Sequence, residues 1–526
     1  MTRVGGEVLR KAGGIAGFSA ARWVIAAHGV VLLALVAHGI AYLLYAVEAV
    51  RFPFELDYGE GIVWQQALYI PDGPMYGDIT RFPFLVFHYP PVYHLVTRAA
   101  ALLNGDMLLA GRAVSVLCTL LTGLLVAALA YETAGPRVSR TARLMGAAAG
   151  GLTVFCYWPV VAWSPLMRVD MLAVLLSFLG VWLALRAARQ PWLLHAAVLA
   201  FVLAVYTKQT SIAAPLAVLA VFWITDRRLA LKAYGMGLVV GLAVLAVLSW
   251  MTEGGFLRHL LLYNLNRFSF GAAFQVVGRH AQQLVFLLLA LYGVAAGWRW
   301  AKNAPGWRHL SRFPEYLRRE AAARPMAVLT LYLILATLML VTLGKSGAEL
   351  NYLIEWMCLW SVLIGVLLIS ILDPFCTEDA PRGRILFALL VPAALLAQVA
   401  IMPAARGYGD SGGGADTMRQ LETLTARIRD ARAPVLSDDM VLLLKAGKTV
   451  PWEPAIFAEL ASTGRWDERL IVDKIMARGF AFILTLAKPG EGAYENRFTP
   501  AVHRAIEAAY PRLEKLGGHT LHLPPD

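Results

Sequence analysis

Long apolar runs alternate with short polar segments over most of the 526-residue chain. A run of about 18 or more apolar residues is long enough to cross the hydrocarbon core of a bilayer as a helix. The pattern predicts about eleven such spans, at 23–47, 109–131, 143–163, 170–189, 192–207, 209–225, 234–251, 281–299, 326–344, 352–372 and 385–404. We therefore expect an α-helical integral membrane protein.

The last 122 residues have a different pattern, in which amphipathic and strand-like stretches alternate. A flexible joint is predicted at GYGDSGGGAD (407–416). Amphipathic TMRQLETLTARIRDA follows, and PVLSDD and AFILTLA are typical of short buried strands. The stretch MVLLLKAGK ends in glycine as a capped helix does. The sequence thus predicts a transmembrane domain at 1–404 and a small α/β domain at 405–526.

The segment between the first two predicted spans, 48–108, is too polar to cross a bilayer. Its acids include Glu55, Asp57, Glu60 and Asp78, and they lie among aromatic residues and prolines. Aromatic rings suit the headgroup level of a membrane, and the amphipathic stretch 88–104 is predicted to lie along the interface. So long and aromatic a loop is typical of an ordered, functional segment. We interpret it as the floor of an active site.

The composition agrees with a membrane protein, because 59% of the residues are hydrophobic and the mean hydropathy is +0.60. The net charge of +12 points first to lysine and arginine on the cytoplasmic side, and not to nucleic acid. With the N-terminus inside, the inner segments carry 21 lysines and arginines and the outer loops before the last span carry 9. This bias predicts a bacterial inner (plasma) membrane protein with a cytoplasmic N-terminus and a periplasmic or extracellular C-terminal domain. The four cysteines have the spacing of neither a disulfide framework nor a zinc site.

Polar residues gather at the outer ends of three pairs of spans. They are Arg168 and Asp170 in SPLMRVD, Lys208 and Gln209 in YTKQTS, and Lys345, Glu349, Asn351 and Glu355 in KSGAELNYLIE. Charged groups at membrane depth are costly, so they tend to line a cavity or pair with one another. The predicted topology puts all of them on the side of the Asp57 loop. We therefore expect a cavity at the outer leaflet, with acids on its floor and cations in its walls.

This combination of groups indicates a chemistry. A carboxylate can take the proton of a hydroxyl as a general base. Lysine and arginine can hold a phosphate and stabilise the negative charge that gathers on it as it leaves. Together they favour the transfer of a group from a lipid phosphate to an acceptor hydroxyl.

These motifs resemble the GT-C membrane glycosyltransferases, in particular the branch of protein mannosyltransferases and aminoarabinose transferases. The resemblance implies a polyprenyl-phosphate sugar donor and a first outer loop, held by two interfacial helices, that carries the catalytic aspartate. ELDYGEG matches that motif at Asp57, and HYPPVYH (88–94) resembles the family's Lys-Pro-Pro-Leu motif with its aromatics. TKQ resembles the family lysine at Lys208, and RVD resembles the acid that opens a later span at Asp170.

Two positions depart from the family pattern. The family's adjacent Asp-Glu pair is Asp57-Tyr58 here, so that Glu60 is the nearest acid downstream. The family's lysine before Pro-Pro is Tyr89.

We expect a hexosyl- or pentosyltransferase that inverts the anomeric centre by one direct displacement. The acceptor would be an outer-face hydroxyl of a glycan, a lipid or a protein. The predicted catalytic residues are Asp57, as general base, and Glu60. The predicted substrate-binding residues are His88, Tyr89, Arg168, Asp170, Lys208, Gln209, Lys345, Glu349, Asn351, Tyr352 and Glu355. No cofactor is implied, and a divalent metal is left open.

Each residue also has a structural interpretation. Asp57 can cap a helix near Gly59, Glu60 can cap, pair with a cation or bind metal, and His88 can be a hydrogen-bonded interfacial histidine. Arg168 can pair with Asp170 and Lys345 with Glu349, while Lys208 can extend to the interface.

The alternative function is a transporter or flippase of a lipid-linked substrate. It would have broken helices at the bilayer midplane and two repeated halves, and the sequence indicates neither. A structural or signalling role for the C-terminal domain would leave the polar span ends unexplained.

Overall fold

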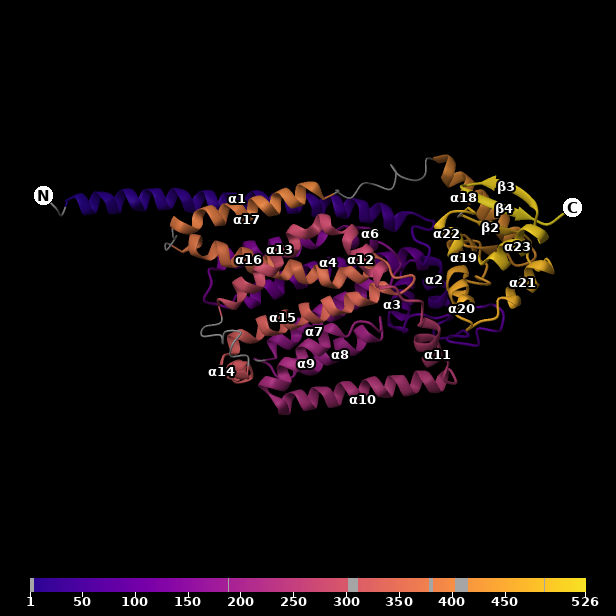
Figure 1. Ribbon diagram of the computed structural model, residues 1–526, viewed down its shortest axis with the longest axis horizontal. Helices are drawn as coiled ribbons and strands as arrows, with labels where there is room; N and C mark the ends of the chain where they lie inside the picture. The colour runs from indigo at the N-terminus through magenta and orange to yellow at the C-terminus, as the bar shows by residue number, and fades with distance from the viewer. Residues whose placement is uncertain (1–3, 188, 301–310, 378–381, 403–414, 487) are drawn as a thin grey trace.

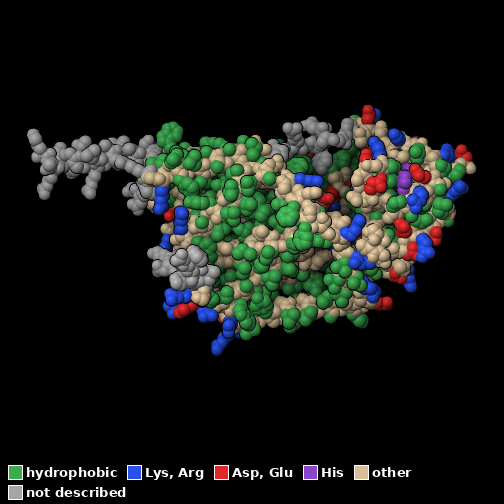
Figure 2. Space-filling model, in the orientation of Figure 1, with side chains coloured by type: hydrophobic (Ala, Val, Ile, Leu, Met, Phe, Trp, Pro, Cys, Tyr) green, Lys and Arg blue, Asp and Glu red, His purple; other side chains and the backbone are tan. Residues whose placement is uncertain are grey.

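A bundle of long helices carries a small α/β domain at one end (Figure 1). The computed structural model describes residues 4–187, 189–300, 311–377, 382–402, 415–486 and 488–526. The predicted joint at 407–416 lies outside these residues, apart from its last two positions. The face of the bundle seen in Figure 2 is largely hydrophobic, and charged side chains gather at its ends and on the α/β domain. This surface is that of a membrane protein.

The bundle helices are α1 (Val4–Arg51), α4 (Met107–Thr133), α5 (Arg140–Thr153), α7 (Asp170–Arg186), α8 (Leu193–Val205), α9 (Ala213–Thr225), α10 (Arg227–Met251), α13 (Leu284–Trp298), α15 (Arg324–Met339), α16 (Ile354–Cys376) and α17 (Ile385–Ile401). By length and composition, six described stretches can cross a membrane, namely Ala21–Arg51, Met107–Thr133, Arg227–Met251, Ala281–Trp298, Ala321–Gly344 and Leu350–Cys376. Helices α8, α9 and α17 are apolar but shorter. The prediction of an α-helical membrane protein is confirmed.

The predicted third span, 143–163, is not one helix. Helix α5 ends at Thr153, a 3₁₀ turn η1 (Val154–Cys156) follows, and Tyr157 is extended before α6 (Trp158–Trp163) begins. Pro159 lies in the first turn of α6, where the backbone N–H that proline lacks has no partner within the helix. In the middle of a longer helix that continued from α5, the same proline would remove a backbone hydrogen bond. The proline thus starts a separate short helix towards the end of the bundle that carries the α/β domain (Figure 1).

Helix α16 forms the centre of the bundle, since nearly all of its residues are buried. Small residues let its neighbours approach closely. A Cβ on Gly150 of α5 would lie 2.7 Å from the carbonyl oxygen of Ser361. Such close backbone packing is how membrane helices associate without a hydrophobic driving force between them.

Short helices cover the end of the bundle nearest the α/β domain. They are α2 (Glu60–Tyr69), α3 (Val92–Ala101), α6, α11 (Gly255–Leu261), η2 (Leu262–Asn264), α12 (Phe270–Arg279), η3 (Ala281–Gln283), η6 (Leu340–Gly344) and η7 (Leu350–Leu353). The opposite end carries α14 (Phe313–Arg319), η5 (Ala321–Ala323) and η8 (Arg382–Arg384). The segments that the topology places outside therefore share one end of the bundle, and the compartment that this end faces stays a prediction.

The C-terminal domain contains a four-stranded sheet in the order β1-β2-β4-β3. Strands β1 (Leu436–Ser437) and β2 (Ile483–Thr485) are parallel and fall in the two predicted strands. Strands β3 (Arg512–Leu516) and β4 (His519–Leu523) form an antiparallel hairpin that is not among the predictions. The sequence feature that could have predicted this hairpin is Gly517-Gly518, since these glycines take φ +60° and +79° and suit a two-residue hairpin turn.

Helices surround this sheet, and the loop segment between α1 and α4 packs into their core. The helices are α18 (Ala415–Asp430), α19 (Met440–Lys445), α20 (Pro454–Ser462), α21 (Arg469–Met476), α22 (Gly492–Glu495) and α23 (Pro500–Ala509). Phe84 of the loop is buried with Trp452 and Phe457, and its N–H donates to the Pro451 carbonyl at 2.9 Å. The loop and the C-terminal domain therefore form one continuous wall.

Candidate active site

A cavity of about 1080 Å³ lies between the end of the bundle and the C-terminal domain. Its lining includes Glu55 to Gly59, His88, Tyr89, Arg168, Lys208 to Thr210, Asn264, Arg267, Lys345 to Gly347, Glu349 and Tyr352 on the bundle side. From the C-terminal domain it includes Asp439, Glu453, Glu459, Arg497 and His519. A cavity of this size accommodates a ligand larger than most drug-sized molecules.

Asp57 lies in the cavity wall with one carboxylate oxygen anchored and the other open. Its Oδ2 accepts the Gly59 N–H at 3.0 Å and forms an ion pair with the Arg168 guanidinium. Its Oδ1 accepts no hydrogen bond from the described residues, and its side chain is 22% exposed. Gly59, not Asp57, is the N-cap residue of α2, so the capping interpretation is wrong. The geometry leaves Oδ1 free to meet a ligand.

Gly59 makes room for this ion pair. A Cβ at Gly59 would overlap the guanidinium of Arg168. The glycine of the ELDYGEG motif is therefore required by the close approach of a side chain that lies more than a hundred residues away in the sequence.

Glu60 lies behind the wall, fully buried in an ion pair with Arg112 of α4. Its Oε1 accepts from Arg112 Nε at 2.7 Å and from the Met167 N–H at 2.9 Å. Its Oε2 accepts from Arg112 Nη2 at 2.6 Å and from the Leu56 N–H at 2.9 Å. With four donors on its two oxygens and no contact with the cavity, Glu60 is not placed to act in catalysis, which corrects that prediction.

Arg112 anchors the loop that carries Asp57. Besides Glu60, it donates to the carbonyl oxygens of Ala49 at 3.0 Å, Phe52 at 2.5 Å and Phe54 at 2.7 Å. All five N–H groups of the guanidinium are thereby used. Because Glu60 also holds Met167, the residue before Arg168, this pair positions both members of the Asp57–Arg168 ion pair.

Replacing Arg112 with methionine should destabilise the protein by about 3–5 kcal/mol, because it leaves the buried Glu60 carboxylate without its counter-charge. The unfolding temperature in detergent measures this loss. The double variant Arg112→Met/Glu60→Gln removes the stranded charge and should recover part of it. A single variant that unfolds at the wild-type temperature would show that the buried pair does not stabilise the loop.

Lys208 forms a second buried ion pair, with Asp170 at 2.6 Å. Asp170 also accepts from Asn351 Nδ2 at 2.9 Å and from Trp163 Nε1 at 2.8 Å, while the Lys208 ammonium lies 4.5 Å from the centre of the Tyr352 ring. Burial lowers the pKa of Lys208, but Asp170, Tyr352 and Tyr89 together raise it by more, so the pKa lies above its ordinary value. The predicted residues of three separate motifs thus meet, with Lys208 and Tyr352 in the cavity wall and Asp170 and Asn351 behind it.

Lys345 and His88 line the cavity near this pair. The Lys345 ammonium donates to Asn264 Oδ1, and burial lowers its pKa to about 8. His88 is half-buried, its Nε2 is buried and unpartnered among the described residues, and burial lowers its pKa to about 3. The Gln209 amide donates to the His88 carbonyl at 3.0 Å. His88 is therefore neutral, its backbone carbonyl is fixed by Gln209, and the Lys345 charge acts on its ring.

Tyr89 and Glu349 also line the cavity. Burial raises the pKa of the Tyr89 phenol to about 12 and raises the pKa of the Glu349 carboxyl. Both side chains therefore favour their neutral forms more than they would in water.

The chain is similar to known proteins in part of its sequence and in its fold. Residues 88–250 match the family model described as dolichyl-phosphate-mannose-protein mannosyltransferase. No curated protein matches the sequence. ArnT from Cupriavidus metallidurans in the apo state has a similar structure, with a TM-score of 0.56 and 13% identity over 95% of this chain and 100% of that chain. The chain has the GT-C fold.

Two further structures support this assignment of the GT-C fold. ArnT from the same organism bound to undecaprenyl phosphate has a TM-score of 0.55 and 15% identity over 95% of this chain and 99% of that chain. The archaeal oligosaccharyltransferase AglB from Archaeoglobus fulgidus, in complex with an inhibitory peptide and a dolichol-phosphate, has a TM-score of 0.50 and 12% identity. That match covers 85% of this chain and 69% of AglB. The fold expected from the motif resemblance is confirmed.

Several predicted contacts of this GT-C protein are different in the structure. Arg168 does not pair with Asp170, because each has another partner, Asp57 and Lys208 respectively. Lys345 contacts Asn264, and no described ion pair joins it to Glu349. Glu355 lies away from the cavity lining, where it accepts from the Tyr332 hydroxyl at 2.5 Å between α15 and α16. Its predicted substrate-binding role is therefore not supported by its position.

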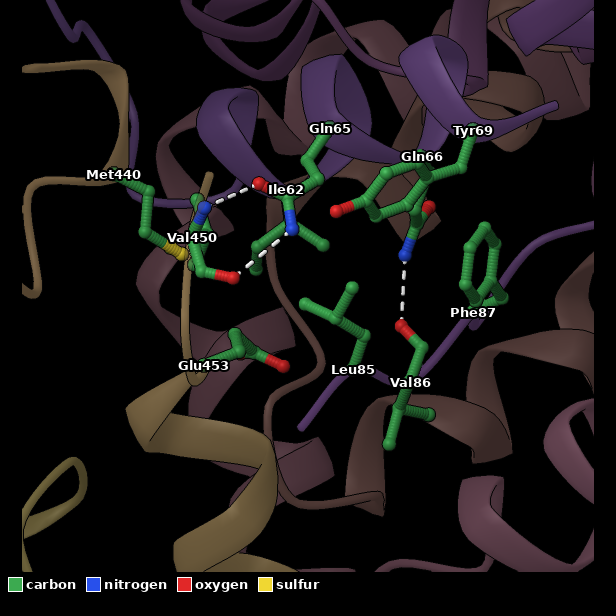
Figure 3. A pocket seen from close by; sticks show the side chains of 10 residues that line it. All are labelled: Ile62, Gln65, Gln66, Tyr69, Leu85, Val86, Phe87, Met440, Val450 and Glu453. Atoms are coloured by element: carbon green, nitrogen blue, oxygen red, sulfur yellow. Dashed lines mark hydrogen bonds between the residues drawn. The ribbon is translucent and has the colours of Figure 1, made fainter. Parts of the chain in front are cut away.

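The contribution of the C-terminal domain to the cavity is not among the sequence predictions. Glu459 of α20 contacts two loops: it pairs with Arg267, after η2, at 2.9 Å and accepts from the Ser346 hydroxyl, after η6, at 3.2 Å. Gln65 of α2 exchanges two hydrogen bonds with the backbone of Val450, at 3.0 and 2.5 Å, next to Glu453 (Figure 3). No sequence signal linked residues 439–519 to the cavity. Arg112 is also missing from the predicted site, although it could have been found as a lone arginine inside the predicted span 109–131.

No group of three or more His, Cys, Asp or Glu side chains among the described residues is arranged to hold a metal ion. The divalent metal left open by the sequence stays a prediction.

Proposed function

We propose that this GT-C protein transfers a sugar from a polyprenyl-phosphate donor to an acceptor hydroxyl on the outer face of the membrane. One observation carries the proposal: a single cavity at the end of the bundle combines the open Oδ1 of Asp57 with the ammonium groups of Lys208 and Lys345. The family model over residues 88–250 supports it, as do ArnT bound to undecaprenyl phosphate and AglB bound to a dolichol-phosphate.

The proposed reaction is one displacement. Asp57 Oδ1 takes the proton of the acceptor hydroxyl as that oxygen forms a bond to the anomeric carbon of the donor. The bond from this carbon to the phosphate oxygen breaks, and its electron pair leaves with the lipid phosphate. Attack opposite the leaving group inverts the anomeric centre. Arg168 balances the charge of Asp57 before the proton arrives.

Lys208 and Lys345 would hold the donor phosphate. Lysine binds phosphate as a compact point charge. Lys208 uses one of its three N–H donors on Asp170 and keeps the others for a ligand. Negative charge grows on the phosphate as the sugar leaves, so both cations would stabilise the transition state more than the bound donor.

Donor affinity should fall as the pH rises through about 8, because Lys345 is cationic below its pKa of about 8 and neutral above it. Binding of a polyprenyl-phosphate sugar, measured at about pH 7 and about pH 9, tests this dependence. The Lys345→Arg variant should lose it, since a guanidinium stays protonated over this range. Equal affinity of the wild type at both pH values would exclude Lys345 from the phosphate site.

The proposed orientation predicts which side of the membrane is labelled. In a Cys376→Ser background, cysteine at exposed Lys515 of β3 should react with an impermeant maleimide on intact cells or spheroplasts. Cysteine at exposed Ser311, beside α14 at the other end, should react only after lysis. The reverse pattern would place the cavity in the cytoplasm, where a nucleotide sugar becomes the expected donor.

A direct assay tests the transferase proposal. Membranes that contain the protein are incubated with radiolabelled polyprenyl-phosphate sugars, one hexose or pentose at a time, and with outer-face glycan, lipid and protein acceptors. We expect labelled sugar in one acceptor and free polyprenyl phosphate in equal amount. Label that crosses the membrane while still attached to its lipid would instead identify a flippase.

A further inference from the structure

Two carboxyl groups in the cavity lining each have one oxygen without a hydrogen-bond donor among the described residues. Glu55 of the first outer loop and Glu453 of the C-terminal domain both line the cavity, and the Oε2 of each is buried without a partner among the described residues. Glu453 is only 4% exposed, and its Oε1 accepts the Ile456 N–H at 3.3 Å as the N-cap of α20. A buried oxygen without a donor is costly, which indicates that a ligand supplies donors here.

The other acids around Glu55 already have cationic partners. Asp57 pairs with Arg168, Asp438 with Arg497 at 2.9 Å, and Asp439 with His519 at 3.1 Å. The two His519 ring nitrogens face a carbonyl oxygen and a carboxylate, both acceptors, so the ring donates from both nitrogens as an imidazolium.

Glu55 and Glu453 have no such ion pair among the described residues. Burial and the charges of Asp439 and Asp57 raise the pKa of Glu55 well above its ordinary value. Burial raises the pKa of Glu453 to about 8. In the empty cavity both groups therefore favour the protonated form, and a bound cation would displace those protons.

No cation is among the described groups that shift the pKa of Glu55, and the charges of Arg168 and Arg497 act on Glu453 without forming an ion pair with it. A bound cation with several donors would supply what the two open oxygens lack. The Tyr58 hydroxyl accepts the Ala455 N–H at 3.0 Å, and Arg497 lies 4.1 Å from its ring centre. A hydrogen bond from Tyr58 lowers the pKa of Glu453, and the charge of Asp438 acts on both Tyr58 and Glu55. The charges that act most strongly on Glu55 and Glu453 include neither Lys208 nor Lys345. The cations that act on Glu453 are Arg168 and Arg497, and not the two lysines proposed to hold the donor phosphate.

We infer that the corner formed by Glu55, Tyr58 and Glu453 binds a protonated primary amine that the acceptor carries close to its nucleophilic hydroxyl. An ammonium brings three donors and the missing charge, whereas a hydroxyl brings one donor and no charge. Glu55, which would bind the amine, is two residues from Asp57, which would bind the hydroxyl. The amine and the hydroxyl therefore belong to the same small part of the acceptor, such as one unacetylated amino sugar. The inference rests on the proposed function, because it assigns Asp57 the acceptor hydroxyl.

Binding of simple sugars to the purified protein in nanodiscs tests this inference without any transfer reaction. Glucosamine should bind about tenfold more tightly than N-acetylglucosamine or glucose, and its binding should release protons, seen as a calorimetric enthalpy that depends on the buffer. Glu55→Gln and Glu453→Gln should each remove the preference for the amine. Glu422→Gln, on the exposed face of α18, is the matched control and should keep it.

A second arm separates acceptor from donor. Protein preloaded with polyprenyl phosphate should still bind glucosamine, whereas competition between the two would assign the amine to the donor side and overturn the inference. Equal binding of glucosamine and N-acetylglucosamine, a preference that survives both glutamine variants, or Ca²⁺ or Mn²⁺ displacing glucosamine at this corner would also overturn it. None of these results bears on sugar transfer, which the membrane assay tests separately.

Discussion

Replacing Asp57 with asparagine should abolish sugar transfer while the protein still folds and inserts into the membrane. Asparagine keeps an oxygen for the Gly59 N–H but cannot take the proton of the acceptor hydroxyl. General-base catalysis contributes a factor of about 10²–10⁴ in rate, so the residual rate should fall near the background. Release of polyprenyl phosphate from a radiolabelled donor measures the effect, and the unfolding temperature confirms the fold.

Asp78→Asn is the matched control for this variant. Asp78 lies in the same outer loop but is exposed, and it contacts Thr80 and Arg81 away from the cavity lining. It should transfer sugar at the wild-type rate. A fully active Asp57→Asn protein would end the assignment of the base, and Glu60, buried in its ion pair with Arg112, is not placed to act instead.

Replacing Lys208 with alanine should slow transfer by about 10²–10³ and weaken donor binding, because charge on the departing phosphate loses a donor in a site shielded from water. A lysine that merely extended to the interface would lose little on replacement. The structure adds a complication, because alanine also leaves Asp170 as a buried carboxylate without its cation. The rate must therefore be separated from a loss of folded protein.

A set of variants makes this separation. In the double variant Lys208→Ala/Asp170→Asn no buried charge is stranded, so it should fold like the wild type and still transfer slowly. Lys208→Arg keeps the charge and should regain part of the rate, limited by geometry. If the double variant transfers at the wild-type rate with unchanged donor affinity, the phosphate is held by Arg168 or Lys345, or lies elsewhere.

The parts of the fold that follow from local pattern were predictable from sequence. Hydrophobic runs of membrane length gave the helices, and the strands at 436–437 and 483–485 lie in short apolar stretches. The convergence of Asp57, Lys208 and Lys345 on one cavity followed from topology, because charged span ends on one side of a membrane must share the space that water reaches.

Pairing between distant side chains was not predictable. Arg168 had an acid two residues away in Asp170, yet it contacts Asp57, because the Glu60–Arg112 pair fixes Met167 beside the loop. The wall made by Glu453 and His519 depends on the docking of the C-terminal domain, which no periodicity encodes. Pro159 divided the third predicted span because its lack of an N–H outweighs local hydrophobicity.

The position of a bound donor tests the proposed transferase site most directly. Cryo-EM of the Asp57→Asn protein with a polyprenyl-phosphate sugar, which this variant should bind without turning over, would locate the phosphate. We expect its density within hydrogen-bonding distance of the Lys208 and Lys345 ammonium groups, with the anomeric carbon facing residue 57. Phosphate density outside the cavity, or a sugar turned away from residue 57, would contradict the proposed site.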